Sequence, residues 1–149
     1  MCFFFATGFF FFPGVFENKA QLALVIDFSK SSEKTIESLT QNYWELYTEF
    51  RAQNPFIEIE IALIGYSRKA FNEKNNYVKI ISDFKDPPEV AFEYLVHNKI
   101  GSSVAENNVG YALDIALQGL SWSNSEAVKK QIFTIWLTLI KLYLKRFLI

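Results

Sequence analysis

The stretch that most constrains the fold is QLALVIDFSKSS, residues 21–32. It contains a short apolar run that ends in Asp27, and hydroxyl side chains follow at Ser29, Ser31 and Ser32. An apolar run with Val and Ile, closed by polar residues and followed by a helical pattern, is typical of a buried parallel strand that turns tightly into a helix. We therefore expect Asp27 at the carboxyl end of a central strand, where open α/β sheets bind ligands.

The spacing of Asp27, Ser29 and Ser31 has two interpretations. One carboxylate and two hydroxyls on a tight turn can converge on a hard cation such as Mg²⁺, which takes oxygen ligands in an octahedron and usually keeps some waters. Alternatively, Ser29, Ser31 or Ser32 caps the following helix, as serine commonly does. Both interpretations remain open at this point.

The run Asp27-Phe28-Ser29-Lys30-Ser31 resembles the Asp-x-Ser-x-Ser signature of von Willebrand factor A (vWA) domains, which opens their metal-ion-dependent adhesion site (MIDAS). Residues 77–84, YVKIISDF, resemble the third-strand segment of bacterial-type vWA domains. Residues 108–122, NVGYALDIALQGLSW, resemble the helix that follows the family's Gly-rich metal loop, up to its closing Trp. The resemblance covers residues 20–137.

The resemblance implies an α/β fold: a Rossmann-like vWA sheet, mostly parallel with one antiparallel edge strand, and helices on both faces. The family's strand order begins 3-2-1-4, which makes the strand before Asp27 central. The family also has two further strands, for which residues 138–149 provide no length. We therefore expect a sheet that is incomplete at the C-terminus, with the fourth strand as an exposed apolar edge prone to association.

Apolar periodicity supplies the other elements. Residues 32–53 have a helical stripe, residues 57–65 change from alternation to a continuous apolar run, and residues 77–82 form a shorter strand after a polar loop. Pro87-Pro88 opens a helix, residues 109–120 form another with Asn107 or Asn108 as its cap, and residues 131–137 form a strand. The helix that Pro87-Pro88 opens is expected to have an inner face of Val90, Ala91, Tyr94 and Leu95. The helix over residues 109–120 is expected to have an inner face of Val109, Ala112, Leu113, Ala116, Leu117 and Leu120.

Two metal ligands that the resemblance implies are replaced. The Thr or Asp expected in the Gly-rich loop falls on Val104, and the Asp expected after the fourth strand falls on Leu137. Ser102, Ser103 or Glu106 can substitute only if the loop shifts. The predicted metal set is therefore Asp27, Ser29, Ser31 and Ser103, with Mg²⁺ bound weakly or not at all.

Composition excludes several function classes. A net charge of −1 gives no electrostatic case for nucleic acid or for an anionic membrane surface. The single cysteine excludes an intrachain disulfide and a Cys-based zinc site. The single histidine, His97, falls in the last turn of a helix, where it offsets the helix dipole rather than acting as a base.

The two ends differ from the middle of the chain. Residues 1–19 are a Phe-rich leader or signal-like segment without a preceding Lys or Arg. Residues 138–149 are an apolar and basic tail, interpreted as an amphipathic helix against the sheet edge, a membrane-surface helix, or a truncated end without a role. Membrane association is expected only through these termini. The expected location is secreted or cell surface, and otherwise cytoplasmic.

The leading functional hypothesis is a protein-binding module of adhesion or scaffold type. The resemblance implies that a partner's acidic side chain completes the shell of a Mg²⁺ at the top of the sheet. A degenerate vWA remnant that works without metal is the first alternative. A Rossmann-like hydrolase using Asp27 is the second, and it is disfavoured because no Gly-rich phosphate loop follows the strand. We therefore expect no enzymatic activity.

Overall fold

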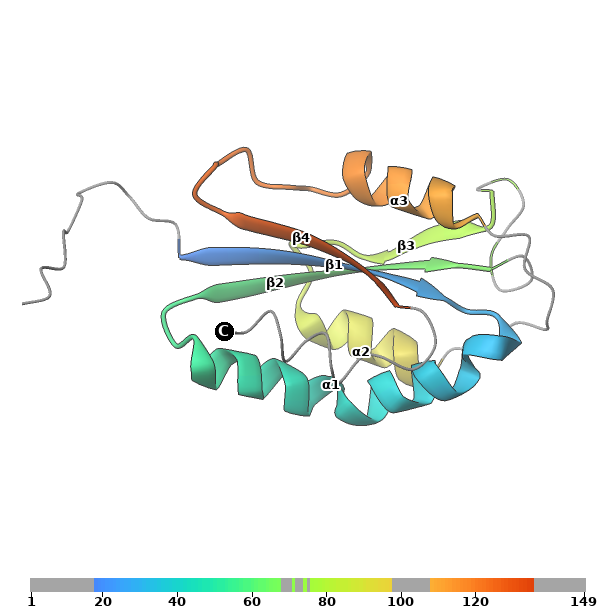
Figure 1. The fold of residues 1–149 in the computed structure, drawn as a ribbon, viewed down its shortest axis with the longest axis horizontal. Coiled ribbons are helices and arrows are strands. Elements are labelled where there is room, and N and C mark those ends of the chain that lie inside the picture. Colours follow the sequence, from blue (N-terminus) through green and yellow to red (C-terminus); the bar gives the residue numbers. More distant parts are fainter. Residues whose placement is uncertain (1–17, 68–70, 72–73, 75, 98–107, 136–149) are drawn as a thin grey trace, which may run out of the picture.

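The computed structural model describes residues 18–67, 71, 74, 76–97 and 108–135. The described elements form a four-stranded sheet with three α-helices (Figure 1). In chain order they are β1 (Lys19–Asp27), the 3₁₀ turn η1 (Lys30–Ser32), α1 (Glu33–Gln53), β2 (Glu58–Tyr66), β3 (Val78–Ser82), α2 (Pro88–His97), α3 (Val109–Gln118) and β4 (Lys129–Ile135).

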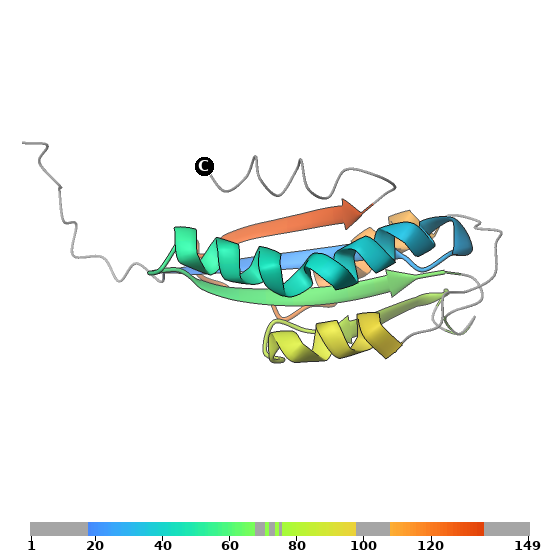
Figure 2. The same ribbon diagram turned by 90° about the horizontal axis from the view of Figure 1, so that it is seen from below.

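The strand order is β3-β2-β1-β4, as the vWA resemblance implies. The central strand β1 runs parallel to both β2 and β4, whereas β3 is an antiparallel edge strand beside β2. Figures 1 and 2 show α1 and α2 on one face of the sheet and α3 on the other. The predicted fold class is confirmed: a mostly parallel α/β sheet with one antiparallel strand and helices on both faces.

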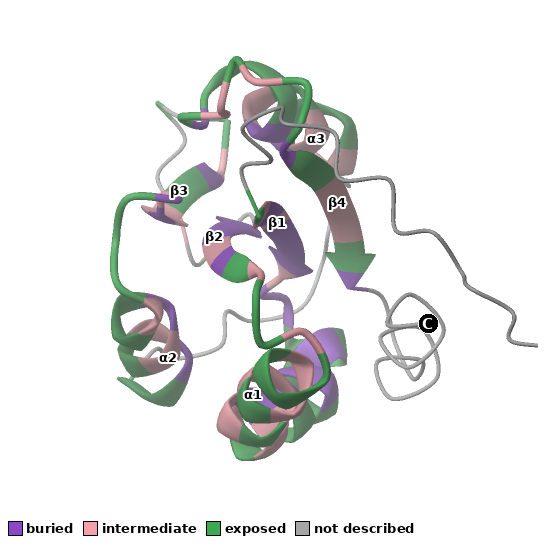
Figure 3. Cartoon of the chain, turned by 90° about the vertical axis from the view of Figure 1, so that its left-hand side faces the viewer, coloured by how far each residue is buried: buried purple, intermediate pink, exposed green. Residues whose placement is uncertain are grey.

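The apolar run of β1 supplies side chains to both faces of the sheet. Ala23 and Val25 pack beneath α3, and Leu24 and Ile26 pack against α1. Because both faces of a central parallel strand are covered, its residues are continuously apolar rather than alternating. Figure 3 shows β1 buried along most of its length.

Two helix faces differ from the expectation. Val90 in α2 is exposed, although Ala91 and Leu95 beside it are buried. Leu117 in α3 is 64% exposed, whereas Ala112 and Ala116 contact the sheet with no exposed surface. Each of these ten-residue helices rests on a narrow line of contact, so apolar residues at the margin of the stripe remain in solvent.

Polar contacts fasten the amino end of β1. Gln21, which is buried within the strand, donates from Nε2 to Oε2 of Glu60 at 2.7 Å. Its Oε1 accepts the backbone N–H of Ser123 at 2.8 Å. Lys19 donates to the other carboxylate oxygen of Glu60 at 2.7 Å. The connection from α3 to β4 is therefore hydrogen-bonded directly to the central strand.

Asp83 fastens the same connection to the end of β3. Its carboxylate accepts the Ser121 hydroxyl at 2.6 Å and the Ser121 N–H at 3.0 Å, and the Phe84 N–H at 2.7 Å. Partial burial raises the pKa of Asp83, but these hydrogen bonds and the charge of Lys85 outweigh burial and lower the pKa below its ordinary value. The folded protein therefore favours the ionised carboxylate.

Acid is expected to weaken the hydrogen bonds that the Asp83 carboxylate accepts from Ser121 and Phe84. Because the folded pKa of Asp83 is depressed, its contribution to stability is present above the pKa of the unfolded chain and is lost as the pH falls through the folded pKa. Melting temperatures measured from about pH 5 to about pH 2 should fall less steeply for Asp83→Asn than for the parent. Ser121→Ala, which removes one donor, should give an intermediate slope. Identical slopes for all three proteins would contradict this role.

Within the described residues, no helix is both long and apolar enough to cross a membrane. Residues 1–17 of the Phe-rich leader and residues 138–149 lie outside the described part of the chain. The expectations about both segments therefore stay predictions.

Candidate functional site

The chain turns sharply at the carboxyl end of β1. Asp27 is the last residue of the strand and pairs in register with Tyr66 of β2. The Phe28 N–H continues the ladder by donating to the Tyr66 carbonyl at 3.0 Å. Because β1 lies between β2 and β4, the turn stands over the middle of the sheet's carboxyl edge, as predicted.

The three side chains of the Asp-x-Ser-x-Ser motif converge in this turn. The Ser29 N–H donates to Asp27 Oδ1 at 2.8 Å, and the Ser29 hydroxyl donates to Oδ2 at 2.9 Å. The Ser29 and Ser31 hydroxyl oxygens lie 2.8 Å apart. Ser29 is buried, Asp27 is half-buried and Ser31 is exposed. The cluster therefore opens to solvent on the Ser31 side.

Side-chain capping, the alternative interpretation of the serines, is not observed. Ser29 precedes η1 and Ser32 precedes α1, but neither side chain caps the helix that follows. The Ser29 hydroxyl contacts Asp27 and Ser31 instead. At α3, Asn108 occupies the cap position without a side-chain cap, and its Nδ2 donates to the Asn76 carbonyl. The Asp27 cluster is thus a preformed group of polar atoms rather than a helix cap.

Phe28 anchors the turn, and the sequence analysis did not single it out. Its side chain is 1% exposed. It contacts Phe71 and Tyr94 edge to face, with ring centroids 5.6 and 5.7 Å apart respectively. Because Phe28 lies between Asp27 and Ser29, burying its ring fixes the backbone that carries both polar side chains. A lone aromatic residue between polar neighbours was the signal that could have revealed it.

The oxygen positions suit a small divalent cation. Two ligands at adjacent corners of an octahedron, each about 2.1 Å from Mg²⁺, are about 3 Å apart. The separations from Ser29 Oγ to Asp27 Oδ2 and to Ser31 Oγ, 2.9 and 2.8 Å, are close to this value. The donor set is one carboxylate and two hydroxyls, so its charge offsets only half that of the ion. The residues fit Mg²⁺, but as a weak partial shell.

The fourth member of the predicted metal set, Ser103, is not among the described residues. Val104 and Leu137 also lie outside them, so the loop substitution stays a prediction. Among the residues that the structure places, no group of three or more His, Cys, Asp or Glu side chains is arranged to hold a metal. His97 ends α2, as expected, and its Nδ1 lies 2.9 Å from the Glu93 carbonyl oxygen one turn earlier.

Comparisons with known proteins show a distant likeness to solved structures. No family model and no curated protein matches the chain. Among solved structures, the chain is similar to proximal thread matrix protein 1 from the mussel byssus, determined with a zinc-occupied MIDAS motif. The identity is 16% and the TM-score is 0.45, and the match covers 80% of this chain and 29% of that one. The chain thus spans less than a third of that protein's length, and the fold class stated above rests on its own strand order.

Proposed function

We propose that the chain is a protein-binding module of vWA type that engages its partner at the carboxyl edge of the sheet. The observation that supports it is the cluster of Asp27, Ser29 and Ser31 at the end of the central strand, in which the Ser29 hydroxyl lies 2.9 Å from Asp27 Oδ2 and 2.8 Å from Ser31 Oγ. A cluster of this kind, half-open to solvent and built on a buried strand, offers fixed polar contacts to an incoming side chain.

A Mg²⁺ ion held by Asp27, Ser29 and Ser31 is the finer part of the proposal. The ion would supply a positive charge at the surface and open coordination positions, since Mg²⁺ is commonly held by one or two carboxylates plus waters. One protein carboxylate leaves the charge of the ion half offset. An acidic side chain from the partner would supply the missing charge, which makes an aspartate- or glutamate-bearing protein the favoured ligand.

Thermal unfolding of the full chain with and without Mg²⁺ tests the metal. At ten times the dissociation constant, a single site adds about 1.4 kcal/mol to the free energy of unfolding. We expect a rise in melting temperature with millimolar Mg²⁺ that is lost in Asp27→Ala. The matched control is Asp114→Ala, which removes an exposed carboxylate on α3 and should keep the rise. A rise that survives Asp27→Ala would place the ion elsewhere.

The partner's chemistry has its own test. With Mg²⁺ present, an aspartate-rich peptide should bind the immobilised chain, and a lysine-rich peptide of equal length should not. Asp27→Ala should abolish this binding. Binding of the acidic peptide that is unchanged by a chelator would support a module that works without metal. Equal binding of both peptides would contradict an acidic partner at this edge.

A further inference from the structure

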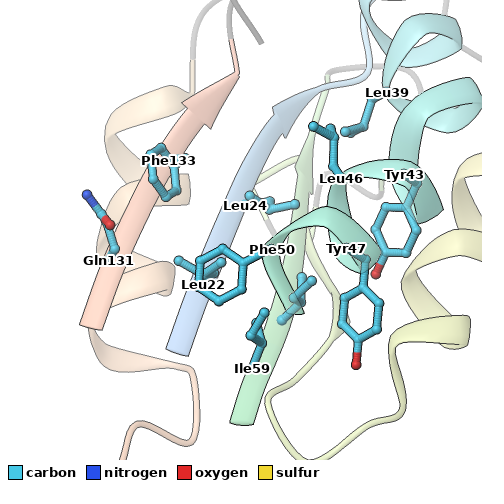
Figure 4. A pocket seen from close by; sticks show the side chains of 11 residues that line it. Leu22, Leu24, Leu39, Tyr43, Leu46, Tyr47, Phe50, Ile59, Gln131 and Phe133 are labelled. Carbon is cyan, nitrogen blue, oxygen red and sulfur yellow. The ribbon is translucent and has the colours of Figure 1, made fainter. Parts of the chain in front are cut away.

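The face of the sheet beneath α1 contains an apolar hollow at some distance along the strands from the Asp27 turn. Figure 4 shows its floor on β1 and its walls on α1 and β4. The lining includes Leu22 and Leu24 on the floor, Leu46 and Phe50 from α1, and Gln131 and Phe133 from β4.

The hollow lies beside α1, where the described helices do not cover β4. Figures 2 and 3 show α1 along β1 and β2, while β4 lies to one side of it. Within the described part of the chain, no helix lies over β4 on this face. Phe133 and Ile135 nevertheless belong to the apolar cluster of this face. An element of matching apolar character is needed to complete the layer.

We propose that residues 138–149 of this same chain fill the hollow as an amphipathic helix that runs back along β4. The segment reads TLIKLYLKRFLI and begins three residues after the last residue of β4. Ile140, Leu144, Phe147 and Leu148 follow the i, i+4, i+7, i+8 spacing of one helix face. Lys141 and Lys145 lie at the margin of this face and Arg146 lies opposite it, so their charged ends would remain in solvent.

The dimensions agree with this placement. β4 has seven residues and is therefore about 23 Å long. A helix of twelve residues is about 18 Å long, so residues 138–149 can return along most of the strand. Successive apolar residues of the segment would then meet successive lining residues of α1, with Leu144 near Leu46 and Phe147 near Phe50. The segment is covalently tied to the strand that forms one wall, which makes its local concentration high.

Disulfide trapping in the full chain tests this placement. In a Cys2→Ser background, the pair Leu46→Cys and Leu144→Cys should form an intramolecular disulfide with oxidised glutathione, because a disulfide requires Cα atoms about 4.4–6.8 Å apart. A second pair, Phe50→Cys and Phe147→Cys, tests the direction of the helix. The matched control replaces the exposed Glu45, the neighbour of Leu46, and pairs Glu45→Cys with Leu144→Cys. We expect at least tenfold slower trapping in the control.

Each outcome decides the proposal. Rapid intramolecular trapping of both hollow pairs, with native circular dichroism before oxidation, supports it. Equal rates for the Leu46 and Glu45 pairs would show that the segment is not seated in the hollow. Disulfide-linked dimers in place of monomers would assign the hollow to a second copy of the chain. Either of these results overturns the proposal. If one hollow pair unfolds the protein, the other still provides the test.

Discussion

Replacing Phe28 by alanine is expected to lower the free energy of unfolding by about 3–5 kcal/mol, the usual cost of removing a buried phenylalanine side chain. The ring is 1% exposed and contacts two other aromatic rings edge to face. Alanine would leave a cavity and would also remove these ring contacts, which are worth about 0.5–1.5 kcal/mol each beyond burial. Urea denaturation of the parent and the variant measures the loss directly.

Two matched variants make this test specific. Phe28→Leu keeps most of the volume and should cost less than half as much as alanine. Phe56→Ala removes a phenylalanine that is 82% exposed and should change stability by less than about 0.5 kcal/mol. The proposed site adds a second readout, because Phe28→Ala frees the backbone between Asp27 and Ser29. Any Mg²⁺-dependent rise in melting temperature should therefore shrink. A loss of less than about 1 kcal/mol for Phe28→Ala would contradict the anchoring role.

Replacing Gln21 by leucine is expected to have the second largest effect. The substitution removes the hydrogen bonds to Glu60 and from Ser123 and introduces an apolar side chain of similar size. The Ser123 N–H, left unpaired in a poorly hydrated position, costs about 1–3 kcal/mol, whereas Glu60 keeps its contact with Lys19. The loss should appear in chemical denaturation as a lower midpoint with an unchanged slope.

The control for Gln21 is another glutamine with a hydrogen bond. Gln118 donates to Asp114 one turn earlier on α3, but both side chains are exposed. Gln118→Leu should therefore change stability by less than about 0.5 kcal/mol. If Gln21→Leu were as mild as Gln118→Leu, the contacts of Gln21 would not be fastening the connection between α3 and β4.

The order of the elements could be predicted because each carries a local pattern. The apolar run before Asp27, the helical stripe that begins at residue 32 and the Pro-initiated α2 all depend on neighbours in sequence. The strand order followed from the family resemblance rather than from these patterns. The antiparallel course of β3 followed from the short polar connection before it, since parallel strands need a longer crossover.

The predictions that were wrong depended on contacts between distant residues. Val90 and Leu117 satisfy the helical spacing, but the width of the contact with the sheet leaves them exposed. A sequence pattern identifies the centre of an apolar stripe and not its margin. The serines at the start of α1 were also ambiguous, because Ser29 can bond the helix end or the Asp27 carboxylate. Only the folded turn decides between these partners. Gln21 was hidden in an apolar strand because its partners come from β2 and from residue 123.

The polar fastenings and the Asp27 turn occupy opposite ends of the same strand. Gln21 and Asp27 are six positions apart in β1, which corresponds to about 20 Å along the strand. Substitutions separated by more than about 10 Å and sharing no partner act independently on stability. The side chains of the turn can therefore be replaced while Gln21 keeps its hydrogen bonds to Glu60 and Ser123. One end of β1 thus carries contacts that stabilise the fold and the other end carries the proposed site, so the proposed site can be redesigned separately from the contacts that hold the fold together.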